Sequence, residues 1–458
     1  MARRDTIVAA ATPPGRGGVA IVRVSGEDVP AIARALLGEL PAPREARYLS
    51  WQDADGQLLD TGIVLHFPAP HSYTGEHVLE LQGHGGDVIV EALIERIVEL
   101  GARRARPGEF TERAFLNNRI DLAQAEAVAD LIQAGSKRAA QAALRSLQGG
   151  FSDAVNAAAA ALTSLRVYVE AAIDFPEEEI DFLGSQELRE RLEDVQRRVA
   201  GVLAAAEQGA VLTRGLTIAI AGRPNAGKST LMNALAGHDV AIVTPVAGTT
   251  RDLLRERVQV QGVPVELIDT AGLREHTSDA IEAEGMRRAR EAIAKADHLL
   301  FVVDASADPG AQSFEEERAA LPEGVPVTIL LNKIDLVPEA QRHIPGLSTH
   351  PGTGTAAPVL PISAATGEGL DELRRRLAAR AGHAEEGGGT FSARARHVEA
   401  LRRASARLAA AAAQLAAKQG ELAALELRET QRALGEVVGD VSSDELLGRI
   451  FGSFCIGK

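Results

Sequence analysis

A glycine-rich segment can bind the phosphates of a nucleotide. Residues Gly222–Ser229 (GRPNAGKS) have the spacing G-x-x-x-x-G-K-[ST], between an apolar run and the helix-like sequence LMNALAG. Its glycines let backbone N–H groups surround phosphate oxygens at the start of a helix. Lys228 would neutralise charge on the β- and γ-phosphates, and the Ser229 hydroxyl would bind Mg²⁺. In this context the motif predicts a phosphate site rather than a chance glycine-rich turn.

Two further motifs lie in the order expected for the switch segments of a G protein. Asp269–Gly272 (DTAG) follows an apolar strand, and Gly248–Asp252 (GTTRD) lies between it and the phosphate loop. Asp269 would hold Mg²⁺ through water, and the N–H of Gly272 would meet the γ-phosphate. The hydroxyl of Thr250 is the expected second switch ligand of Mg²⁺.

The base is predicted to be guanine. Asn332–Asp335 (NKID) ends another apolar strand, and an aspartate there accepts hydrogen bonds from guanine N1–H and N2–H₂. Adenine presents an acceptor at N1 and would leave a buried polar group unpaired. Ser363–Ala365 would offer a backbone contact to guanine O6. The residues predicted to contact GTP are Asn225, Ala226, Gly227, Lys228, Ser229, Thr230, Thr244, Pro245, Val246, Ala247, Gly248, Thr249, Thr250, Asp269, Thr270, Ala271, Gly272, Asn332, Lys333, Ile334, Asp335, Ser363, Ala364 and Ala365.

The residue after the DTAG motif departs from the Ras pattern. Ras-like proteins place a glutamine there to orient the attacking water, whereas this chain has Leu273, which can neither orient nor polarise water. Either the protein does not hydrolyse GTP, or another group performs this task. The charged candidates just downstream are Arg274, Glu275, Asp279, Glu282 and Glu284.

The elements that position these motifs form an α/β region. Apolar strand candidates 216–221, 265–269, 298–304, 325–332 and 359–362 alternate with helical segments. This alternation predicts a parallel sheet with helices on both faces. Before it, strand candidates 6–11, 19–24, 62–66 and 78–81 and helical segments 28–37 and 88–100 predict a compact α+β domain.

Alanine- and leucine-rich helical sequence flanks the α/β region. It covers residues 122–209 and resumes at 391–438, with a loop expected at 174–184. The fold class is therefore α/β and α+β multidomain, with a Ras-like P-loop domain inserted into a discontinuous helical domain. The predicted bounds are 1–119 for the N-terminal domain, 120–214 and 381–458 for the helical domain, and 215–380 for the G domain.

Composition limits the classes of function. The 458 residues include 49 Lys and Arg and 63 Asp and Glu, so the formal charge is 49 − 63 = −14. Such a chain contacts RNA only through local basic patches, for which the candidates are arginines 103, 104, 106, 113 and 119 and arginines 394, 396, 402, 403 and 407. The single cysteine, Cys455, excludes a disulfide framework. No membrane span or signal peptide is apparent, which predicts a cytoplasmic protein.

Several longer sequence blocks are similar to the tRNA modification GTPase family MnmE (TrmE). They are Asp5–Gly26, Ser72–Gly86, Arg106–Ile132, the four G motifs and the terminal Cys-Ile-Gly-Lys, 455–458. This resemblance implies action with an MnmG (GidA)-like flavoprotein. The two would add an aminomethyl or carboxymethylaminomethyl group to carbon 5 of the wobble uridine of certain tRNAs. It also implies a one-carbon unit from a tetrahydrofolate derivative (5-formyl- or 5,10-methylene-) and a homodimer formed through the N-terminal domain.

The resemblance also assigns site residues. It implies that potassium at an interface between two G domains aids hydrolysis, with Asn225, Thr244, Val246 and Thr249 as its ligands. Beside the β- and γ-phosphates, such a cation would stabilise transition-state charge. The water-orienting role maps to Glu282, with Glu284 as the alternative. The folate contacts map to Arg23, Glu80, Arg119 and Lys458, and the tail would bring the Cys455 thiol to the folate pocket.

Two other interpretations stay open on the residues alone. A GTP-switched assembly factor, for example in ribosome maturation, would share the G motifs but would have no use for folate. An inert G protein would explain Leu273. Folate binding and potassium-stimulated GTP turnover distinguish these alternatives from the modification enzyme.

Overall fold

A computed structural model describes residues 5–174, 185–236, 255–261, 263–269, 287, 290–319, 321–322, 324–338, 357–380, 391–440, 444–454 and 457. The chain divides into two compact units. The first comprises 1–129, 147–198 and 403–458, and the second comprises 130–146 and 199–402. None of the helices in the described ranges is long and apolar enough to cross a membrane.

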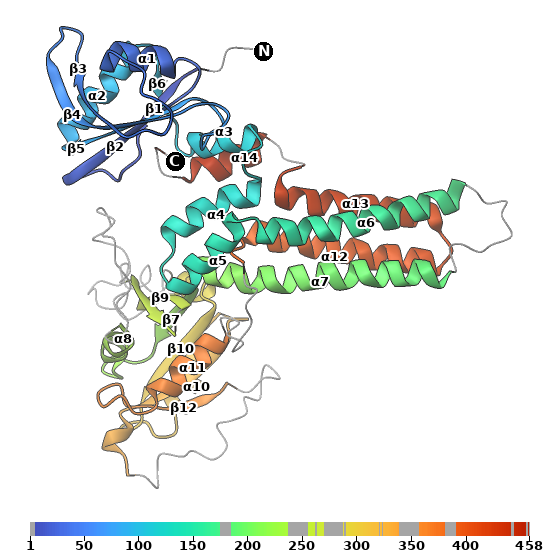
Figure 1. The fold of residues 1–458 in the computed structure, drawn as a ribbon. Coiled ribbons are helices and arrows are strands. Elements are labelled where there is room, and N and C mark those ends of the chain that lie inside the picture. The colour runs from blue at the N-terminus through green and yellow to red at the C-terminus, as the bar shows by residue number, and fades with distance from the viewer. Residues whose placement is uncertain are drawn as a thin grey trace. The chain divides into compact units, whose positions relative to one another are not determined.

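The N-terminal domain contains a mixed sheet with the strand order β3-β4-β5-β2-β1-β6. The strands are β1 (Ile7–Ala10), β2 (Gly17–Ser25), β3 (Arg47–Gln52), β4 (Leu58–Phe67), β5 (Val78–Gly85) and β6 (Arg103–Arg104). Helices α1 (Val29–Leu37) and α2 (Asp87–Glu99) share one apolar core with the sheet (Figure 1). Helix α3 (Glu109–Leu116) contributes Phe110 to a smaller cluster with Ile7 and Ala9 of β1. These contacts confirm the predicted α+β domain.

Long helices follow. They are α4 (Leu122–Gln133), α5 (Lys137–Leu147), α6 (Gly150–Asp174) and α7 (Gln186–Arg214), and after the G domain α12 (Ala395–Ala416), α13 (Gly420–Val438) and α14 (Asp444–Gly452). Within the first unit α13 runs along α6, and α14 packs on α3 through Phe451 and Phe454 (Figure 1). The expected loop at 174–184 lies, except for Asp174, outside the described residues.

The α/β region forms the sheet β12-β11-β10-β7-β9-β8. Its strands are β7 (Leu216–Ala221), β8 (Arg255–Val260), β9 (Val263–Asp269), β10 (His298–Asp304), β11 (Val327–Asn332) and β12 (Val359–Pro361). All neighbours pair in parallel except β8 and β9. Helices α8 (Lys228–Ala236) and α11 (Leu370–Arg380) cover one face, and α10 (Gln312–Arg318) packs on the other. The predicted doubly covered parallel sheet is therefore confirmed.

The strand order indicates at which edge of this sheet a ligand binds. The chain order reverses at β7, and in open α/β sheets ligands bind where such a reversal occurs, beyond the carboxyl ends of the strands. The segment after β7 is the phosphate loop, and the NKID motif begins at the carboxyl end of β11. The motifs from distant parts of the sequence therefore meet at one edge of the sheet.

Candidate functional site: a guanine-nucleotide pocket

The phosphate loop has the close backbone approaches that its glycines predict. Gly227 has φ = +96°, and a Cβ at this position would lie 2.2 Å from the Asn332 side-chain nitrogen. Gly222 has φ = +135°, and its Cβ would meet the Val302 carbonyl oxygen at 2.2 Å. An alanine would therefore be strained at both positions. The loop fits the tight phosphate cradle inferred from its sequence.

Lys228 and Ser229 open helix α8. The buried Lys228 ammonium donates hydrogen bonds of 2.8 Å to the carbonyl oxygens of Gly222 and Arg223. These bonds hold the ammonium within the loop, where it can neutralise phosphate charge. Ser229 is exposed at the first turn of the helix, where its hydroxyl is available to a metal ion.

Asn332 connects three segments of the site. Its side-chain nitrogen donates to the Ala226 carbonyl oxygen at 2.8 Å, and its side-chain oxygen accepts from the Ala364 N–H at 2.9 Å. Only 2% of Asn332 is exposed. The last residue of β11 thus holds the phosphate loop against the Ser363–Ala365 segment, so phosphate and base contacts form one rigid site.

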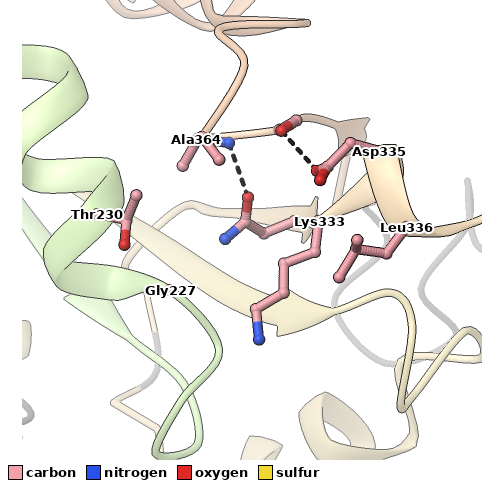
Figure 2. Close-up of a pocket in the computed structure, with 9 residues that line it drawn as sticks. Gly227, Thr230, Lys333, Asp335, Leu336 and Ala364 are labelled. Carbon is pink, nitrogen blue, oxygen red and sulfur yellow. Dashed lines mark hydrogen bonds between the residues drawn. The ribbon is translucent and has the colours of Figure 1, made fainter.

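Asp335, the residue predicted to contact guanine, is held in place from the same segment. Ser363 Oγ donates to Asp335 Oδ1 at 2.6 Å, and Figure 2 draws this bond as the dashed line at Asp335. A cavity of about 160 Å³ is lined by residues from the phosphate loop and both base motifs: Gly227, Thr230, Asn332, Lys333, Asp335, Leu336, Ser363, Ala364 and Ala365. Eight of these nine residues, all except Leu336, were predicted from sequence as phosphate-loop or base-side contacts. Gly227 and Thr230 place the two sets in one pocket.

Lys333 is fixed by a residue that the sequence motifs do not contain. Its backbone is left-handed (φ = +64°), and its ammonium lies 2.6 Å from Asp304 Oδ2 at the end of β10. Burial opposes ionisation of Asp304, but hydrogen bonds from Lys333 and Ser306 outweigh it and hold the carboxyl pKa below its usual value. The sequence analysis did not include Asp304 or Leu336 among the site residues. The signal for Asp304 is an aspartate at the end of an apolar strand, and the signal for Leu336 is its place directly after the NKID motif.

The remaining predicted residues of the nucleotide, metal and tail sites divide into two groups. Asn225 is exposed in a left-handed conformation (φ = +62°), and Asp269 ends β9. Ile334, within the NKID motif, is buried in an apolar core cluster of the G domain. The others lie outside the described residues: Thr244, Pro245, Val246, Ala247, Gly248, Thr249, Thr250, Thr270, Ala271, Gly272, Glu282, Cys455 and Lys458, with Leu273 and Glu284. Their roles stay predictions.

Two of the predicted folate residues are paired with each other. Residues Arg23 and Glu80 face one another on β2 and β5, and the guanidinium donates two hydrogen bonds (2.9 and 2.7 Å) to Glu80 Oε1. The guanidinium carbon lies 5.8 Å from the ring centres of Tyr73 and Phe110. A cation, a carboxylate and aromatic faces suit a ligand that has amide-like edges and carboxylates. Exposed Arg119 lies instead beside Gly75.

Both predicted basic patches are largely neutralised within the chain. Arg103 and Arg113 bind Glu109, Arg104 binds Glu91, and Arg106 binds Glu112. In the second patch the pairs are Arg394–Asp130, Arg402–Glu207, Arg403–Glu436 and Arg407–Glu426. Arginines already paired with carboxylates add little net positive potential, so neither patch is a strong phosphate-binding surface.

The sheet order, the phosphate loop and the guanine-reading motif define a P-loop GTPase. The family model described as "GTP-binding protein TrmE N-terminus" matches residues 6–119, and that described as "MnmE helical domain" matches residues 122–455. The chain is 53% identical over 463 aligned residues to the tRNA modification GTPase MnmE of Erwinia tasmaniensis, with all of both proteins covered. The chain therefore belongs to the MnmE family of tRNA modification GTPases.

Solved structures of other GTPases are similar to part of the chain. Aquifex aeolicus Era bound to GDP·AlF₄⁻ is 27% identical, and the match covers 42% of this chain and 66% of that one at a TM-score of 0.28. The G domain of the T. maritima FeoB iron transporter is also 27% identical, with 36% and 98% covered and a TM-score of 0.26.

Proposed function

We propose that this GTPase acts with an MnmG (GidA)-like flavoprotein to modify the wobble uridine of certain tRNAs. The pair would add an aminomethyl or carboxymethylaminomethyl group to carbon 5, taking the one-carbon unit from a tetrahydrofolate derivative. The observation that carries the proposal is the full-length similarity to MnmE, which includes the N-terminal domain as well as the G motifs. A GTP-switched assembly factor would need the G motifs but not the N-terminal domain.

We assign a task to each of these residues of the nucleotide site. Asp335 reads the guanine, Lys228 neutralises phosphate charge, and Asn332 keeps the two subsites in register. Ser229, with Thr250, would hold Mg²⁺, which supplies charge neutralisation at the β- and γ-phosphates. Asn225, with Thr244, Val246 and Thr249, would hold potassium, which supplies further positive charge there.

The water-orienting residue of hydrolysis is proposed to be Glu282. Leu273 cannot serve, and a glutamate carboxylate can accept a hydrogen bond from the attacking water. Glu282→Ala is expected to abolish hydrolysis while keeping GTP affinity. Retained hydrolysis would move the assignment to Glu284.

The folate site is proposed around Arg23 and Glu80. The carboxylate would accept from the amide-like edge of a pterin, and the guanidinium would bind carboxylate or carbonyl oxygens. Arg119 and the terminal Lys458 would add cations for the glutamate tail, and Cys455 would come close to the same pocket. The N-terminal domain would also carry the homodimer contact, and the protein would work in the cytoplasm.

Nucleoside mass spectrometry of tRNA tests the proposal. A strain lacking the protein should lose its 5-aminomethyl-type wobble uridines, and the intact chain should restore them. The Glu80→Gln variant should not restore the modified uridines. The matched control, Glu91→Gln, should restore them, because it removes an exposed carboxylate of the same domain that pairs with Arg104 and lies outside the proposed folate site. Unchanged wobble uridines in the deletion strain would overturn the proposal in favour of an assembly factor.

A further inference from the structure

Helix α5 (Lys137–Leu147) is unusually basic for this chain. Residues 131–152 contain no Asp or Glu, although the whole protein has 63 acidic residues among 458, or about one in seven. The helix itself carries Lys137, Arg138 and Arg145. This stretch therefore supplies no carboxylate at helical spacing that could pair with these cations.

The helical register separates a buried face of α5 from a charged one. Ala139, Ala142, Ala143 and Ser146 are buried, and Ser146 Oγ donates to the Ser392 carbonyl oxygen at 3.0 Å. On the other side Lys137, Gln141 and Arg145 are exposed at intervals of four residues, which places them along one face. At 1.5 Å per residue, Lys137 and Arg145 are about 12 Å apart along the axis.

The two cations at the ends of this face keep their charge available. Among the described residues, neither Lys137 nor Arg145 pairs with a carboxylate, in contrast to the arginines of the two patches discussed above. Each side chain therefore presents a positive charge that no described carboxylate compensates. Polyanions are the partners that such a face fits, because binding releases condensed counterions from the phosphates.

We propose that the exposed face of α5, with Lys137 and Arg145 as its anchors, binds the phosphate backbone of the tRNA. This inference rests on the proposed function, and it adds a location for the substrate in a chain that is acidic overall. Phosphate contacts position a nucleic acid and carry no sequence information. The α5 face therefore holds the tRNA body, and the choice of the wobble base is made elsewhere.

The test measures binding of a fluorescein-labelled, unmodified tRNA transcript with a wobble uridine to the full chain between 50 and 200 mM KCl. Each phosphate contact contributes about 0.7–0.9 to the slope of log affinity against log salt. The double variant Lys137→Gln, Arg145→Gln should therefore have a slope smaller by about 1.4–1.8. Between 50 and 200 mM KCl, the factor by which salt weakens its binding should be about tenfold smaller than the factor for the wild type. Basal GTP hydrolysis and thermal unfolding should be unchanged.

The matched control removes the same charge elsewhere. Arg197→Gln combined with Arg198→Gln neutralises two exposed cations on α7 that both pair with Asp194. This variant should keep the wild-type affinity and slope. Equal losses in both variants would show that net charge alone matters and would overturn the inference, as would wild-type binding by the α5 variant.

The proposed function and the α5 site can fail separately. A wild-type chain that does not bind the tRNA contradicts the proposed function. A wild-type chain that binds while the α5 variant binds equally well contradicts only the site. If the variant keeps its tRNA affinity but loses binding to the flavoprotein, the α5 face contacts a protein and the inference is wrong.

Discussion

Replacing Asn332 by alanine would separate the phosphate loop from the base-binding segment. The change removes the donor to the Ala226 carbonyl and the acceptor of the Ala364 N–H, both in the interior of the site. A buried polar backbone group that loses its partner costs about 1–3 kcal/mol. Two such groups give about 2–6 kcal/mol in total. Because Ala364 lines the pocket, water can reach its N–H, and a loss near the low end of this range, about 2–3 kcal/mol, is expected.

The assay is titration of the variant with a fluorescent GDP analogue. A loss of about 2–3 kcal/mol corresponds to about 30- to 150-fold weaker binding. Asn156→Ala, on the exposed side of α6, is the matched control and should bind as the wild type does. Binding by Asn332→Ala within threefold of the wild type, with unchanged thermal unfolding, would refute the view that this side chain holds the two subsites together.

Three further predictions concern buried or paired charges. Burial opposes ionisation of Glu109, but hydrogen bonds from Arg103, Arg113 and the Arg106 N–H outweigh it and lower the pKa of Glu109 to about 2. The ionised carboxylate therefore stabilises the folded state by about 3 kcal/mol. This contribution is complete above pH ~4.5 and is lost as the pH falls toward 2. Glu109→Gln should lower stability at pH 7 and flatten the acid limb of unfolding measured by circular dichroism. Burial, and then the charge of Arg380, lower the His298 pKa to about 4, so stability falls as the pH drops from about 6.5 to 4. In His298→Gln the decline in unfolding free energy between pH 7 and 5 should be smaller by about 2 kcal/mol, and an unchanged pH profile would contradict the assignment. Asp304→Asn removes the carboxylate that holds Lys333 and should weaken GDP binding about fivefold, or about 1 kcal/mol, in calorimetry, whereas equal affinity would show that the pair does not position the lysine.

Local signals were sufficient for the central strands and the nucleotide motifs. Strands β7 and β10 have the bounds 216–221 and 298–304, as predicted, because central parallel strands are buried on both faces and read as continuous apolar runs. The phosphate loop is similarly local, since its function depends on glycines and a lysine at fixed spacing. The family assignment also came from contiguous blocks of sequence.

The strands that were missed lie at sheet edges. β3 and β6 flank the N-terminal sheet, and β8 flanks the G-domain sheet. An edge strand pairs on one side only, and β3 (RYLSWQ) is largely exposed, so its sequence lacks the apolar run of a central strand. Length and hydrophobicity alone do not separate such a strand from a loop.

The sequence by itself determined the GTPase class, the identity of the base and the family, because each depends on residue types at short, fixed spacings. Only the tertiary structure decided which charges remain available. Arg23 meets Glu80 through the register of β2 and β5, and Asn332 reaches Ala226 across the sheet. Arg394 and Arg403 are paired with Asp130 and Glu436, which are distant in sequence. Lys137 and Arg145 of α5 pair with no carboxylate in the part of the chain that the structure describes. Electrostatic potential at a surface is a sum over neighbours in space, and a linear sequence does not list them.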